Sequence, residues 1–217
     1  MASAVDICNL ALAHLGDEAT VASINPPEGS AQAEHCARFY PLARDSLLEL
    51  HEWGFATRTV QLAQLSGSRW GWQYAYAQPA GTIKLIGVIP PSAASSLDLK
   101  GKSQPYSRES DTNGGTIILT DQPNALARYT ALVEDTTKFT PLFTQTLTWH
   151  LAAMLAGPVL KGDAGAAEAQ RCTGVMSAWL SQAKTSDANQ RKVKQDHTPD
   201  WLHGRGVAIS GPAGWGR

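Results

Sequence analysis

The sequence has no stretch that is long and apolar enough to cross a membrane. Its longest apolar run, residues 151–160, is far shorter than the roughly 20 residues of a membrane-spanning helix and contains Gly157 and Pro158. The N-terminus also lacks the basic segment followed by an apolar one that marks a secretory signal. We therefore expect a protein with no membrane partner that is made and kept in the cytoplasm.

Cysteines are scarce and do not form a disulfide framework. The three of them, Cys8, Cys36 and Cys172, are an odd number without close spacing, and each falls on the apolar side of a predicted helix. A buried free thiol behaves as a small apolar side chain. We predict three reduced core cysteines.

Motifs that carry chemistry are missing as well. The pair Gly114-Gly115 is not followed by the Lys-Ser/Thr of a phosphate loop, and no GxGxxG opens a helix after a strand. The histidines never form HExxH, because His51-Glu52 is followed by Phe55 where the second histidine would stand, and no Cys-x-x-Cys occurs. A GxSxG elbow is absent too. We expect no cofactor, no metal and no catalytic residue.

Charge is nearly balanced overall, with a net charge of −1, but it is unevenly distributed. Residues 1–60 hold eight acidic and three basic side chains, residues 61–183 hold eight and nine, and residues 184–217 hold three and six. The balance gives no global reason to bind nucleic acid, whereas an acidic start and a basic end could pair between copies of the chain.

The most specific stretch is the predicted helix and exit at residues 36–58. Ser30 is a suitable N-cap for a helix that begins near residue 31, and Pro41 predicts a kink or a new segment inside it. We expect Gly54 to end the helix with a positive φ, and Trp53 and Phe55 to cover its end. The apolar stripe of this helix comprises Ala33, Cys36, Ala37, Tyr40, Ala43, Leu47 and Leu48.

Three further helices are predicted. The first runs from Ser3 to Leu15, with Ser3 and Asp6 at capping-box spacing and Gly16 as its stop. Another begins at Thr140-Pro141 and continues through Leu155. The last is capped by Asp163 and carries its stripe to Ala183, before the sequence turns polar at Lys184.

Between the two helix pairs the pattern changes to short β-branched and aromatic runs. These predicted strands span residues 57–62, 83–89, 116–120 and 126–133. Since no predicted helix buries its stripe alone, we expect an α+β fold in which about four helices form an antiparallel bundle and the β block is inserted. The predicted division is a bundle domain of residues 1–56 and 138–186, an inserted antiparallel β-sheet or small sandwich of residues 57–137, and an extended C-terminal arm of residues 187–217.

Charged residues on the long helix allow two interpretations. Asp45, Glu49 and Glu52 could serve a peptidoglycan hydrolase, which needs two carboxylates facing one cleft. Spacing of three and four on a polar face is more typical of solvated surface. Arg38 and Arg44, together with Asp45 and Glu49, are therefore our candidates for contacts between subunits.

Aromatic residues alternate at Trp70, Trp72, Tyr74 and Tyr76, which predicts one face of an extended strand. Such a face could stack single-stranded bases. That function usually comes with basic residues along the groove, and this segment carries only Arg69. We favour packing of the sheet against the helices or against a neighbouring copy.

Four blocks in this order resemble the tail tubular protein A family, the head-to-tail connectors, or adaptors, of tailed bacteriophages. They read ICNLALAHLG, CARFYPLARDSLLELHEWGFATR, WGWQYAYAQPAGTIKLIGV and ALARYTALVEDTTKFTPLFTQTLTWHLAAMLA, and the resemblance covers about residues 3–186. Beyond Lys184 the match is loose. The resemblance implies a helical domain with a β insertion, no enzymatic activity, and assembly as a dodecameric ring beneath the portal.

The resemblance also implies the partners. These are the portal protein, a downstream tail or nozzle protein, identical copies in the ring, and double-stranded DNA that passes through the channel without sequence-specific binding. The expected location is the head–tail junction of the virion, with host cytoplasm as the site of assembly. Because related adaptors engage the portal through the C-terminal segment, the apolar residues of that segment are the candidate portal contacts: Trp201, Leu202, Val207 and Ile209.

Overall fold

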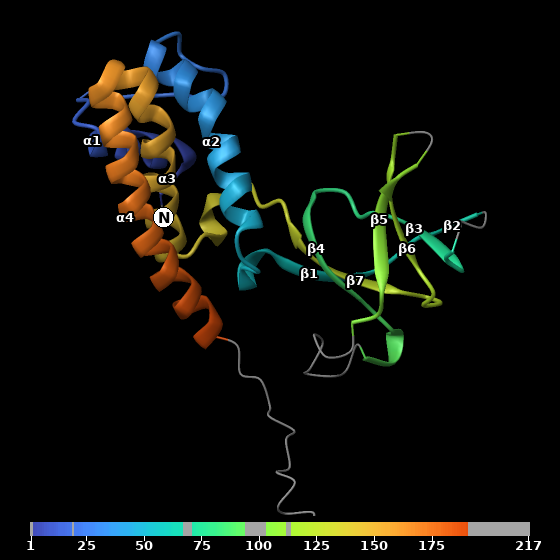
Figure 1. Cartoon of the computed structure of the whole chain (residues 1–217). Helices are drawn as coiled ribbons and strands as arrows, with labels where there is room; N and C mark the ends of the chain where they lie inside the picture. Colours follow the sequence, from blue (N-terminus) through green and yellow to red (C-terminus); the bar gives the residue numbers. More distant parts are fainter. Residues whose placement is uncertain (1, 19, 67–70, 94–102, 112–113, 191–217) are drawn as a thin grey trace, which may run out of the picture.

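The computed structural model describes residues 2–18, 20–66, 71–93, 103–111 and 114–190. In these residues the fold is α+β, with four α-helices gathered on one side and the β-strands on the other (Figure 1). The helices are α1 (Ala4–His14), α2 (Ala31–Glu49), α3 (Pro141–Leu160) and α4 (Gly162–Asn189). The strands are β1 (Thr57–Gln61), β2 (Gln64–Leu65), β3 (Tyr74–Ala77), β4 (Thr82–Ile89), β5 (Tyr106–Ser110), β6 (Thr116–Thr120) and β7 (Leu126–Ala131).

Helix α1 begins and ends as its sequence predicts. The Ser3 hydroxyl accepts the backbone N–H of Asp6, and the Asp6 carboxylate accepts the backbone N–H of Ser3, which completes a capping box. At the other end Gly16 takes φ +76, its N–H donates to Ala13, and the next N–H donates to Leu12. This Schellman arrangement satisfies carbonyls of the last turn.

Helix α2 has no break at Pro41 and does not end at Gly54, whereas a kink at Pro41 stays a prediction. Its N-cap is Ser30, as expected, but the helix continues without a break through Pro41 to Glu49. The bond lost at Pro41 is tolerated because the residues around it bury a continuous apolar stripe. Gly54 does not have a positive φ and does not end the helix, which Leu50 caps in the αR region.

Gly54 instead opens a short 3₁₀ turn, η1 (Gly54–Ala56), after Trp53. The prediction that aromatic residues cover this end is confirmed. Trp53 is 1% exposed, its ring meets Phe143 edge-on at 5.0 Å, and its indole N–H donates to the carbonyl of Leu47. Phe55 packs against the same cluster.

Helix α3 lies among the other three helices and contacts each of them. It starts as predicted, with Thr140 accepting the N–H of Phe143 and Pro141 in the first turn. Helix α4 follows after a single residue, Lys161, which is its N-cap without a side-chain bond. Asp163 is therefore not the cap but lies in the first turn, where a carboxylate favours the positive end of the helix dipole.

The polar sequence after Lys184 does not end α4, which reaches Asn189. Ala183 and Asp187 are both buried and stand four residues apart, so the buried face of the helix continues past the polar turn.

The seven strands form two antiparallel sheets. One has the order β1-β7-β4 and the other the order β2-β3-β6-β5. The four predicted strands are confirmed as β1, β4, β6 and β7, with ends that differ by one or two residues. Strands β2 and β5 were not predicted, because Gln64–Leu65 and Tyr106–Ser110 lie at sheet edges and are short or rich in charged and small residues.

The aromatic alternation does not form one face. Strand β3 begins only at Tyr74, and Tyr74 and Tyr76 pack in one core cluster while Trp72 packs against another, which contains Leu119. Tyr76 is fully buried and its hydroxyl donates to the carbonyl of Gln122. A base-stacking face that includes Tyr76 is therefore contradicted, because this ring lies in the core. Trp70 lies outside the described residues.

The β part is attached to the end of α2. Lys84 Nζ of β4 donates to the carbonyl of Glu49 at 3.4 Å, where the negative end of a helix dipole favours a cation. Val133 is buried in the helical core, and Ile83 and Leu132 pack against it. The strands therefore project from the helices across a narrow junction (Figure 1).

All three cysteines are free and buried, as predicted. Cys8 and Cys36 interact across α1 and α2, and the hydrogen bond to Cys36 together with burial raises the pKa of the Cys8 thiol. Among the described residues, no helix is both long and apolar enough to span a bilayer.

Candidate functional site

One face of α2 carries four residues that are exposed or half-exposed: Arg38, Leu42, Asp45 and Glu49. We call this face the α2 stripe. These residues stand four, seven and eleven positions after the first, so they share one helical face. Leu42 is 58% exposed, the highest value among the exposed large apolar side chains of the described residues. Arg38 and Glu49 are exposed on either side of it. An apolar side chain between opposite charges is typical of a protein contact surface.

Arg44, the fourth predicted subunit contact, is only 7% exposed. Its Nε donates to Asp45 Oδ1 at 2.7 Å, and its Nη1 lies 3.7 Å from Glu134 Oε1. The guanidinium therefore works inside the chain, where it holds the Asp45 carboxylate beside the α2 stripe and ties α2 to the segment that follows β7.

A cavity of about 560 Å³ lies beside Arg44. The Tyr40 side chain lines it and is 4% exposed, its hydroxyl has no partner among the described residues, and burial raises its pKa to about 12. Because Pro41 has no N–H, the carbonyl of Ala37 also lacks its usual helical donor. The cavity, which is further lined by Ala4, Ile24, Asn25, Pro27 and Glu134, therefore combines the Arg44–Glu134 ion pair with a buried hydroxyl that has no partner among the described residues.

The carboxylates considered for a hydrolase are placed differently from one another. Asp45 is bonded to Arg44, Glu49 is exposed at the last turn of α2, and Glu52 follows the helix. None of the three lines the cavity beside Arg44. The described geometry gives no cleft that two of these groups share.

Ser46 and His150 form a Ser–His contact between α2 and α3, with Oγ and Nε2 2.9 Å apart. The Ser46 hydroxyl donates to the carbonyl of Ala43 at 3.1 Å, so it accepts from the imidazole rather than giving it a proton. Burial holds the pKa of His150 below its usual value of 6.5. The contact joins α2 to α3 in a direction opposite to that of an activated serine.

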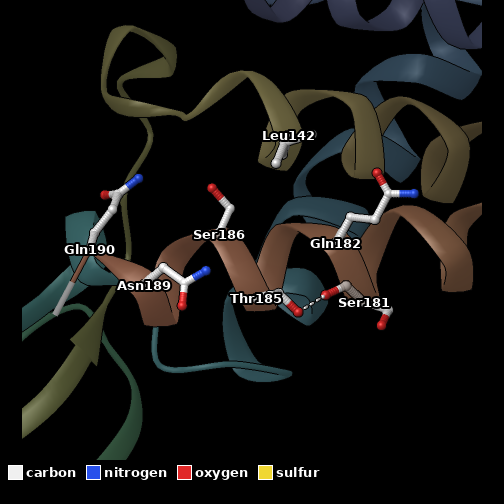
Figure 2. Close-up of a pocket in the computed structure, with 7 residues that line it drawn as sticks. All are labelled: Leu142, Ser181, Gln182, Thr185, Ser186, Asn189 and Gln190. Atoms are coloured by element: carbon white, nitrogen blue, oxygen red, sulfur yellow. Dashed lines mark hydrogen bonds between the residues drawn. The ribbon is translucent and has the colours of Figure 1, made fainter.

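A second cavity, of about 650 Å³, lies between the start of α3 and the last turns of α4. Figure 2 shows its lining, which is Leu142 of α3 and six uncharged polar residues. The six are Ser181, Gln182, Thr185, Ser186, Asn189 and Gln190. Thr185 bonds back to the Ser181 carbonyl, whereas the amides extend from the helix (Figure 2). Such a lining offers hydrogen bonds without charge.

The end of α4 is fixed by a contact that we call the Asp187 latch, comprising Asp187, His51 and Gly54. Asp187 is 6% exposed; its Oδ1 accepts the backbone N–H of Gly54 at 2.8 Å and its Oδ2 lies 3.1 Å from His51 Nε2. A Cβ on Gly54 would come within 3.1 Å of Asp187 Oδ1, so glycine permits this close approach. The latch holds the point from which the C-terminal residues continue.

Comparison with known proteins adds no identity to this geometry. No family model matches the chain, and no curated protein matches it. The resemblance to phage adaptors therefore depends on the sequence blocks alone.

The predicted portal contacts Trp201, Leu202, Val207 and Ile209 lie outside the described residues. The Asp187 latch and the orphan hydroxyl of Tyr40 were missed by sequence reasoning. A buried acid 133 residues away from its amide partner leaves no local pattern, whereas Tyr40 stands on the predicted apolar stripe and could have been flagged as a buried polar group.

Proposed function

We propose that this protein is a structural head-to-tail adaptor of a phage virion. Copies form a ring under the portal, join the portal to the tail and extend the DNA channel, with no bond made or broken. The observation that carries the proposal is the order of elements: two helices, a β insertion that projects from them, and two returning helices. This is the order that the resemblance implies for adaptors.

In this proposal the four helices act as an antiparallel bundle around α3, and the C-terminal residues act as an arm. A central helix whose side chains Phe143, Leu147 and Leu151 are fully buried makes a rigid unit, which suits a part that bears load between head and tail. The Asp187 latch supports the arm, because it fixes the end of α4 and so fixes where the arm leaves the subunit.

The α2 stripe is the proposed contact between subunits. A ring needs a contact in which one patch meets a different patch on the next copy. Arg38, Leu42 and Glu49 offer charge and apolar area on a rigid helix, and the neighbouring cavity offers Tyr40 and Arg44 as partners for an entering side chain.

Deletion of residues 189–217 tests the portal contact. The shortened chain keeps the described core and the latch, so it should fold and assemble but fail to capture the portal protein of the same phage in a pull-down. The double variant Trp201→Ala, Leu202→Ala should fail in the same way, while Lys161→Ala, at the opposite end of α4, should bind normally. Full portal capture by the shortened chain would remove the arm from the proposal.

A zymogram on peptidoglycan separates the adaptor from the hydrolase. The adaptor predicts no clearing by the wild-type chain. Clearing of the peptidoglycan by the wild-type chain would favour the hydrolase. It would establish the hydrolase if the clearing disappeared in Glu49→Gln and persisted in the exposed control Glu34→Gln.

A further inference from the structure

Strand β1 is a sheet edge that has no bulge and no proline and that no other described strand covers. It lies outermost in the order β1-β7-β4, and four of its five residues are exposed, so both of its faces meet solvent. Its pairing with β7 runs from Thr57 to Gln61 without a register shift, and the strand contains no proline. Natural sheets normally interrupt such an edge with a bulge, a proline or a cover.

The other edges differ from β1. Strand β4 carries two register shifts and bears Lys84 in its middle, and β2 has only two residues. Strand β5 matches β1 in length: it is also five residues long, outermost in its sheet and mostly exposed. It carries Arg108 and Glu109 where β1 carries Arg58.

The register shows which backbone groups of β1 face outward. Leu62 N–H donates to the carbonyl of Ala125, which continues the ladder with β7. Because bonded and non-bonded pairs alternate in an antiparallel ladder, Arg58 and Val60 bond to β7. The groups of Thr59 and Gln61 therefore point to the open edge, as does the carbonyl of Thr57, whose N–H donates to Trp53.

The same reasoning applies to β5. Asp111 N–H donates to the carbonyl of Gly115, which continues the ladder with β6. Ser107 and Glu109 consequently bond to β6, and the N–H and C=O groups of Tyr106, Arg108 and Ser110 point to the open edge. Each strand thus offers an alternating set of outward groups over five residues.

We propose that β1 of one copy pairs antiparallel with β5 of a second copy. Aligning the two strands over their full lengths places Thr59 opposite Arg108, so that outward groups on one strand meet outward groups on the other. The same alignment places Arg58 opposite Glu109, an opposite-charge pair on one face of the joined sheet. If one strand shifted by one residue against the other, the outward backbone groups would no longer face each other and Arg58 would no longer lie opposite Glu109.

The pairing is head-to-tail, because β1 and β5 are different surfaces of the same chain. After one pairing, the first copy keeps an open β5 and the second copy keeps an open β1, so further copies can add at both ends. The chain of copies closes into a ring when the rotation per copy allows it. The inference rests on the proposed ring and deepens it by naming a contact between the β parts that adds to the contact through α2.

Charge reversal tests the pairing. Self-association of full-length protein is measured by native mass spectrometry and analytical ultracentrifugation, with and without the portal protein. Arg58→Glu and Glu109→Arg should each weaken association about fivefold or more, and the double variant should recover it to near the wild-type value. Lys161→Glu, an exposed reversal on the helical part, is the matched control and should have no effect.

Thr59→Pro tests the backbone bonds independently. Its N–H points to the open edge, so proline removes a donor from the contact while leaving the β1–β7 bonds in place. The variant should weaken association with an unchanged circular dichroism spectrum, and Thr59→Ser should not. Single variants that associate like the wild type overturn the pairing; if they also bind portal, the adaptor proposal stands. A wild-type chain that neither self-associates nor binds portal overturns both.

Discussion

The helical part and the β part of this molecule are built on different principles. The helices share one core cluster of 24 buried residues, in which α3 is enclosed by its neighbours. The strands divide their buried residues between clusters of nine and three. At the same time β1 is exposed on both faces. The helical part is therefore largely self-sufficient, whereas the β part leaves backbone hydrogen bonds to be made with something else.

This difference indicates a division of labour. In the proposed adaptor, the helical unit keeps its shape and the insertion with open edges makes the contacts with other copies. The junction is formed by Lys84, which bonds to the end of α2, and by Val133, which is buried in the helical core. Comparing substitutions in the two parts tests this view.

The largest expected loss of stability comes from a substitution in the helical core, compared with the same substitution in the β part. Leu151→Ala in α3 should lower the free energy of unfolding by about 4 kcal/mol, because the residue is fully buried among helices that cannot collapse around a void. Leu119→Ala, in the cluster of three residues, should cost about 2 kcal/mol. Urea titration measures both. Equal losses would show that the β part is packed as tightly as the helices.

Disrupting the Asp187 latch should cause the next largest loss of stability. Asp187→Asn weakens the bonds to His51 and Gly54 and should cost about 1–3 kcal/mol, with faster hydrogen exchange at the Gly54 amide. Asp163→Asn, an exposed change in the first turn of the same helix, should cost less than about 1 kcal/mol. Unchanged exchange at Gly54 would mean that the latch does not hold this junction.

Stability should fall on mild acidification. Burial holds the pKa of His150 and His14 below 6.5, so below about pH 6.5 the unfolded chain binds protons that the folded chain does not. The urea midpoint should therefore be lower at pH 5.5 than at pH 7.5, and each tenfold difference in proton affinity contributes about 1.4 kcal/mol. His150→Gln should reduce the pH dependence. A higher midpoint at pH 5.5 would reverse the sign and contradict this account.

The smallest effect compares two tyrosine hydroxyls. Tyr40→Phe in the helical part removes a hydroxyl that has no partner among the described residues, so stability should change by less than about 0.5 kcal/mol or rise. Tyr76→Phe in the β part removes a hydroxyl that donates to Gln122 and should cost about 1 kcal/mol. Thermal melts distinguish the two, and a larger loss for Tyr40→Phe would imply a partner for that hydroxyl.

Local signals in the sequence predicted the helices well. Ser3 with Asp6, and Thr140 with Pro141, act within one turn, so the residues that make each cap are visible side by side. Strand β6 was predicted for a similar reason, because its β-branched residues stand between clear turns.

Longer-range features could not be predicted in this way. Pro41 alone predicts a kink or a break, and the helix stays continuous where buried residues stand on both sides of the proline and α2 packs on α3. Strand β5 has no apolar alternation, because an edge strand needs little burial. The latch joins Asp187 to Gly54 across the fold. Arg38, Asp45 and Glu49 were predicted as subunit contacts from the sequence, but the exposure of Leu42 between them and the burial of Arg44 depend on the packing of α2.

The central claim is that this chain assembles into a ring on a portal. Native mass spectrometry of the full-length protein mixed with the portal protein of the same phage tests it most directly. The account predicts a complex in which a closed ring, of twelve copies according to the resemblance, is bound to the portal, and it predicts that deletion of residues 189–217 abolishes that complex. A chain that stays unbound at any ratio to the portal would contradict the adaptor proposal.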